Sequence, residues 1–140
     1  MKTHQRGISL LETLIASLIL AIGLLGTIGL QARAYSALSD AGMRAEATMA
    51  GEKLLAIMAS DQGAQQANLP NYALAAAGTP STQLAPWYAQ TQALIPGATV
   101  VVTVTPNGNA LCQVDIAISW TRKTGDTRNV HRVTSYIAVS

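Results

Sequence analysis

The chain has 140 residues, of which 49% are hydrophobic and only 11% are charged. Nine basic side chains oppose seven acidic ones, and loss of Lys2 and Arg6 would leave seven of each, which disfavours nucleic acid as the main partner. Cys112 is the single cysteine, so an intrachain disulfide is excluded. This length allows one small domain besides a membrane segment.

The strongest pattern lies near the N-terminus. Ile8 to Leu30 is an apolar run of 23 residues whose only charged side chain is Glu12. As a helix it would span about 34 Å, enough to cross a hydrocarbon core of about 30 Å. The preceding Lys2 and Arg6 predict that the N-terminus stays in the cytoplasm and that the rest of the chain crosses the membrane. A carboxylate within such a span costs about 3 kcal/mol or more, so we expect Glu12 to have a functional partner.

The next segment, residues 31–61, has no proline and is rich in good helix formers, so we predict one helix from Ile8 to about Ser60. Its second half is predicted to be amphipathic and to lie against a soluble domain. Asp40 and Arg44 have the spacing of an ion pair on a helix surface. The apolar side is expected to contain Leu38, Met49, Leu54, Ile57 and Met58.

All five prolines fall in the middle of the chain, and residues 62–97 are rich in glutamine, asparagine, alanine, proline and glycine. We predict a long, variable loop here, with a short helix that begins at Pro86 and ends before Pro96. Trp87 and Tyr88 are its largest adjacent apolar side chains. We expect them to cover the edge of a sheet, and an exposed contact patch is the alternative.

The last part, residues 98–140, changes to the period of two that is typical of half-buried strands. Runs at 98–105, 111–120 and 130–139 predict three antiparallel strands, and the Pro106-Asn107-Gly108-Asn109 segment predicts a hairpin turn between the first two. Cys112 lies on the apolar face and is predicted to be a core residue. We therefore predict an α+β fold in which a long N-terminal helix packs on a small antiparallel sheet.

Three interpretations of the N-terminal run are possible. An ordinary signal peptide has the Ala32-Arg33-Ala34 sequence as a cleavage site, but its apolar core would be shorter than this run. An uncleaved anchor helix would not explain why a charged residue, Glu12, lies within the membrane span. The sequence Arg6-Gly7 followed by Ile8-Ser9-Leu10-Leu11-Glu12 and an apolar run resembles the class III signal of type IV prepilins and pseudopilins.

The resemblance implies a leader of residues 1–7, cleavage between Gly7 and Ile8 by a prepilin peptidase, and N-methylation of Ile8. It also implies that residues 8–30 form a transmembrane and assembly helix. The chain departs from the family at Ile8, where most members carry phenylalanine. The long helix, variable loop and antiparallel sheet are also those of the pilin fold.

Cleavage would create a cationic amine on Ile8, and Glu12 lies one helical turn away in the same apolar layer. Each charge is costly when unpaired in low dielectric. Pairing within one chain satisfies this requirement, as does pairing between neighbouring subunits. The resemblance favours the second, in which the Ile8 amine of a newly docked subunit meets Glu12 of a neighbour and selects the axial register.

Within the family, the Gly23-Leu24-Leu25-Gly26 run and the strand that ends at Trp120 are similar to PilV-type minor pilins, the type IV pilus modification proteins. This implies a non-enzymatic role in pilus biogenesis, adhesion and twitching motility. The implied partners are other minor pilins, the major pilin, the prepilin peptidase and an inner-membrane assembly platform. The implied location is a single inner-membrane pass with a periplasmic C-terminal domain, and then the pilus, or fimbrium, on the cell surface.

Two alternative functions are weighed beside this one. A minor pseudopilin of a type II secretion system shares the N-terminal signal, and a membrane-anchored periplasmic binding module would keep its anchor uncleaved. No cofactor or metal is expected, because His131 alone makes neither a metal site nor a catalytic triad. A basic cluster near the C-terminus is predicted to be a solvated turn rather than a contact for DNA; its members are Arg122, Lys123, Arg128 and Arg132.

Overall fold

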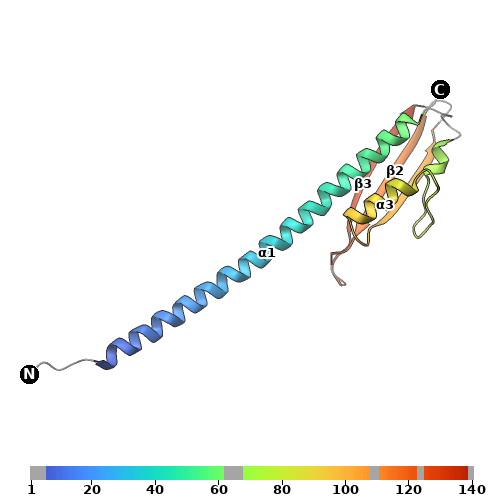
Figure 1. Cartoon of the computed structure of the whole chain (residues 1–140). Coiled ribbons are helices and arrows are strands. Elements are labelled where there is room, and N and C mark those ends of the chain that lie inside the picture. The colour runs from blue at the N-terminus through green and yellow to red at the C-terminus, as the bar shows by residue number, and fades with distance from the viewer. Residues whose placement is uncertain (1–5, 62–67, 108–110, 123–124, 139–140) are drawn as a thin grey trace, which may run out of the picture. The chain divides into compact units, whose positions relative to one another are not determined.

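The structure, a computed structural model, describes residues 6–61, 68–107, 111–122 and 125–138, and the side chains of residues 6–9 are not among those described. Contacts divide the chain into two units, Met1–Ser39 and Asp40–Ser140. The elements are helix α1 (Arg6–Ser60), the 3-10 helix η1 (Leu69–Tyr72), helix α3 (Ala85–Leu94) and strands β1 (Thr99–Pro106), β2 (Leu111–Trp120) and β3 (Asn129–Ala138) (Figure 1).

Helix α1 ends at Ser60, as the sequence predicted, and begins at Arg6. The three strands form one antiparallel sheet in the order β1-β2-β3. A long N-terminal helix followed by a small antiparallel sheet confirms the α+β architecture of the pilin fold. The predicted hairpin turn includes residues 108–110, which lie outside the described residues, but the antiparallel pairing of β1 with β2 on either side of it is confirmed.

The core of the second unit lies between the sheet and its helices. The alternating residues of β2 are buried as predicted, and Cys112 is a core residue. On α1 the buried face follows helical spacing through Ala47, Ala50, Leu54 and Met58. The predicted apolar side was therefore wrong at Leu38 and Met49, which are exposed, because their helical positions do not coincide with this face.

The small residues on this face of α1 allow a close approach to β3. Gly51 is buried, and a β-carbon added there would lie 3.0 Å from Cγ1 of Val133. Close packing therefore favours glycine at this position, although glycine has a poor helix propensity. Gly42 differs, because a β-carbon added there would meet no described atom within 4 Å.

The two glycines allow a matched test of helix propensity against packing. Gly42→Ala is expected to raise the free energy of unfolding by about 1 kcal/mol, because alanine loses less backbone entropy. Gly51→Leu is expected to lower it by about 1–3 kcal/mol, because the new side chain meets Val133 in a packed core. Chemical denaturation of the full chain in detergent measures both changes. Equal effects at the two positions would contradict the close approach of α1 to β3.

The middle segment is more ordered than the predicted loop. Besides α3, which agrees with the predicted short helix, it contains η1 and a single bridge that joins Leu74 to Val102 of β1. Trp87 is 4% exposed, and its indole N–H donates to the carbonyl oxygen of Ala50 over 3.0 Å. Trp87 is therefore not an exposed contact patch. It connects α3 to α1 in the core.

A hydrogen bond holds η1 to the end of α1. The hydroxyl of Tyr72 donates to Oδ2 of Asp61 over 2.8 Å, and the tyrosine is 4% exposed. Burial, the hydrogen bond and the nearby negative charge of Asp61 raise the pKa of Tyr72 from 10.0 to about 12. Each disfavours the tyrosinate in the folded chain.

This pKa difference predicts a loss of stability at high pH. The folded chain binds the Tyr72 proton more tightly than the unfolded chain, so the stabilisation is complete below pH 10 and is lost as the pH rises toward 12. We expect the free energy of unfolding to fall by about 2 kcal/mol between about pH 9 and about pH 11.5 because of this one group. Denaturation of Tyr72→Phe supplies the control, since its curve should lack this part of the decrease. Parallel curves for the two proteins would refute the assignment.

Candidate functional site

The candidate site lies in the first unit, on the N-terminal part of α1. Gly7, Ile8 and Glu12 all fall within this helix. Positions 8 and 12 are one turn apart and therefore share a helix face. No side-chain contact of Ile8 is described. The structure thus brings the backbone positions of Ile8 and Glu12 together on one face, as the sequence predicted.

Glu12 is exposed in this chain, and its surroundings on the helix are apolar. It lines a shallow depression with Leu11, Ile15, Ala16 and Ile19. Among the described residues, no hydrogen bond or ion pair to the Glu12 carboxylate is formed. The described part of the chain therefore supplies no partner for this charge.

The described hydroxyl side chains on this part of the helix form local hydrogen bonds. The hydroxyl of Thr13 donates to the carbonyl oxygen of Leu10 over 2.9 Å, and that of Ser17 donates to the carbonyl oxygen of Leu14 over 2.9 Å. Thr27 makes the equivalent bond to Leu24 over 2.8 Å. Such bonds remove the cost of placing a hydroxyl in an apolar environment. Glu12 differs from these residues because no described backbone or side-chain group bonds to its carboxylate.

The apolar side chains around Glu12 are exposed on all sides of the helix. Helix α1 is long and apolar enough to cross a membrane, a test of length and composition that a signal sequence also passes. Within its most apolar window no residue is buried against the rest of the described chain. This surface needs lipid or other helices to cover it. Its large exposed residues are Leu10, Leu11, Leu14, Ile15, Leu18, Ile19, Leu20, Ile22, Leu24, Leu25, Ile28 and Leu30.

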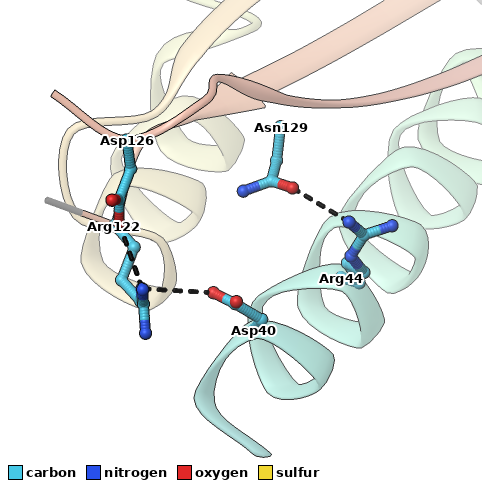
Figure 2. Close-up of polar contacts among 5 residues, drawn as sticks. All are labelled: Asp40, Arg44, Arg122, Asp126 and Asn129. Carbon is cyan, nitrogen blue, oxygen red and sulfur yellow. Dashed lines mark hydrogen bonds and ion pairs between the residues drawn. The ribbon is translucent and has the colours of Figure 1, made fainter. Parts of the chain in front are cut away.

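Five polar side chains of the second unit form a cluster (Figure 2). The sequence predicted a local ion pair for Asp40 and Arg44, and a solvated turn for Arg122. Asp40 and Arg44 do not pair with each other, contrary to the prediction. Arg122 lies 3.7 Å from Asp40 (Nε to Oδ1) and 3.2 Å from Asp126 (Nη2 to Oδ2). Arg44 instead donates to Oδ1 of Asn129 over 2.9 Å. Tertiary partners from the β2–β3 connection and from the start of β3 replace the local ion pair.

The arginines of the predicted basic cluster therefore have partners within the chain. Besides Arg122, Arg128 donates to the hydroxyl of Ser119 and Arg132 lies 3.3 Å from Asp115. Lys123 lies outside the described residues. Arg132 belongs to β3 rather than to the turn. These contacts are partly solvent-exposed and each is worth about 1 kcal/mol or less. The pair of Arg122 with Asp40 joins the β2–β3 connection to α1, whereas Arg128 and Arg132 bond to residues of β2.

No group of three side chains able to ligate a metal occurs among the described residues. The described residues of the N-terminal site provide one carboxylate, one apolar helix and the backbone at the predicted cleavage position. Such a set suits peptide-bond recognition by another enzyme, membrane insertion and helix–helix association.

Comparison with known proteins identifies one motif. Residues 2–28 match the family model described as the prokaryotic N-terminal methylation motif. The match includes the predicted leader, the Gly7–Ile8 bond and Glu12. Comparison with curated proteins and with solved structures found no match. The motif is the class III signal of pilin-like proteins, which are structural subunits, and the apolar helix fits a membrane anchor.

Proposed function

We propose that this chain is a minor pilin, most similar to the PilV type, which enters a type IV pilus or primes its assembly. The methylation motif at residues 2–28 carries this proposal, because its processing site and Glu12 lie on a helix whose apolar surface the described chain leaves uncovered. Roles in pilus biogenesis, adhesion and twitching motility follow from membership of this class. The proposed location is the inner membrane with a periplasmic C-terminal domain, and then the pilus.

In the proposed mechanism a prepilin peptidase cleaves between Gly7 and Ile8 on the cytoplasmic side and methylates the new amine. The subunit waits in the membrane, where lipid covers its apolar helix. On docking, the helices of neighbouring minor and major pilins replace lipid. The Ile8 amine of one subunit then pairs with Glu12 of another, so two charges that are costly alone become a pair at one axial register.

Intact-mass analysis of the protein purified from membranes tests this proposal. The expected mature chain starts at Ile8 and carries one additional methyl group. A chain that starts at Met1 would refute the pilin function and favour a membrane-anchored periplasmic binding module. A chain that starts at Tyr35 would show cleavage after Ala34 and favour an ordinary signal peptide.

The same motif also occurs in pseudopilins, so a second experiment separates the two assemblies. Deletion of the protein is expected to reduce surface pili and twitching while secreted enzymes are still exported. Blocked export with normal pili would instead identify a minor pseudopilin of a type II secretion system.

A further inference from the structure

The two edges of the sheet differ in how the chain covers them. At the β1 edge, the backbone N–H of Leu74 donates to the carbonyl of Val102 over 2.9 Å, and the reverse bond has the same length. No such backbone bond is formed on the outer edge of β3 by any described residue. Among the described residues, the chain thus covers part of the β1 edge and gives the β3 edge no backbone partner.

Strand β3 also lacks most of the features that protect an open edge from pairing. All ten of its residues pair with β2 in one unbroken register, so it has no bulge, and it contains neither proline nor lysine. A long, regular edge of this kind is a template for another strand. Two large side chains on its outer face, Val130 and Tyr136, are 58% and 55% exposed. Apolar side chains of an added strand would pack against them as cross-strand pairs.

One charge on β3 indicates which strand would fit. The side chain of Arg132 is 65% exposed and lies 3.3 Å from Oδ1 of Asp115 on the neighbouring strand. The other carboxylate oxygen of Asp115 accepts a hydrogen bond from Thr134 over 2.9 Å. Both oxygens of Asp115 thereby have a partner, whereas the Arg132 guanidinium has five N–H donors and this ion pair does not use all of them. An acidic side chain on the far side of Arg132 would complete an alternating row of charges.

A second copy of this chain does not fit the edge. Antiparallel pairing of two β3 strands would place both Arg132 side chains on the same face of the joined sheet, and β3 carries no acidic residue to pair with either of them. Parallel pairing about an axis along the strands would place the two Arg132 side chains on opposite faces, without acidic partners.

We propose that the β3 edge binds an extended segment of a different polypeptide, which adds a fourth strand and places an acidic residue beside Arg132. The main-chain hydrogen bonds of β3 would hold the segment, and Arg132 would select it. This proposal concerns the second unit alone and does not depend on entry into a pilus.

Amide hydrogen exchange and NMR shifts of the full chain in detergent micelles test the proposal. The probe is a capped peptide of alternating threonine and valine with a central glutamate, compared with its lysine-centred counterpart. We expect protection and shift changes along β3, and about fivefold weaker binding of the lysine peptide. Changes confined to β1, or no changes up to the solubility limit of the peptide, would overturn the proposal.

Variants at Arg132 separate selection by charge from non-specific strand addition. Arg132→Glu is expected to reverse the preference, and the neutral Arg132→Gln, which introduces no repulsion with Asp115, is expected to abolish it. Thr105→Glu, which lies on the exposed face of β1 opposite Gln113, is the control and should keep the wild-type preference. An unchanged glutamate preference in Arg132→Gln, in a chain whose circular dichroism matches wild type, would also overturn the proposal.

Discussion

Replacing Glu12 with alanine is expected to yield a protein that is processed, methylated and resident in the membrane but almost absent from pili. The carboxylate is exposed on α1 and contacts no other described group, so its loss should not affect folding of the second unit. In the assembled state, however, an Ile8 amine without its partner would remain unpaired in an apolar layer. Breaking a buried ion pair costs about 3–5 kcal/mol, which corresponds to a decrease of at least about a hundredfold in incorporation.

Quantitative blotting of sheared pili against the membrane fraction measures this effect. Glu12→Gln keeps the size of the side chain and removes its charge, so it should behave like Glu12→Ala. Thr13→Val is the matched control, because the Thr13 hydroxyl is already satisfied by Leu10 and is not required for docking. Wild-type incorporation of Glu12→Ala would contradict pairing by charge, and normal incorporation of Glu12→Gln would reduce the role of Glu12 to side-chain packing.

The second large effect is expected at the cleavage site. Replacing Gly7 with leucine should leave the precursor uncleaved, because the peptidase must approach the backbone at this bond and only glycine presents it without a side chain. The leader would then remain attached and the Ile8 amine would not form. We expect less than about a tenth of the protein in the mature form, and a comparable loss from pili.

Intact mass distinguishes the precursor from the mature chain directly. Gly23→Leu is the control, since Gly23 lies in the same helix and a β-carbon added there would meet no described atom within 4 Å. It should be processed normally. Complete cleavage of Gly7→Leu would show that the chain is not a substrate of a prepilin peptidase, whatever the effect of Glu12→Ala.

Combining the two variants orders the events at this site. Gly7→Leu together with Glu12→Ala is expected to accumulate as precursor, as Gly7→Leu alone does, because pairing comes after cleavage. Accumulation of mature chain in the double variant would contradict this order.

The sequence by itself determined the elements that depend on local patterns. The apolar run with Glu12, the absence of proline before position 70 and the alternation in β2 predicted the long helix and the sheet. The class III signal likewise depends on a short contiguous motif, which the matched family model describes. Hydrophobic periodicity and motif spacing are properties of neighbouring residues, and they are therefore visible without a fold.

Only the tertiary structure decided which of several equivalent local contacts form. Asp40 and Arg44 have ideal helical spacing, but Asp40 pairs with Arg122 of the β2–β3 connection and Arg44 bonds to Asn129 at the start of β3. Gly51 is a poor helix former by itself, and only the packing of α1 on Val133 of β3 gives it a structural reason. Helix spacing alone allows many pairs of side chains to interact. Which pairs form depends on where the sheet packs against α1, and that depends on contacts between segments far apart in the chain.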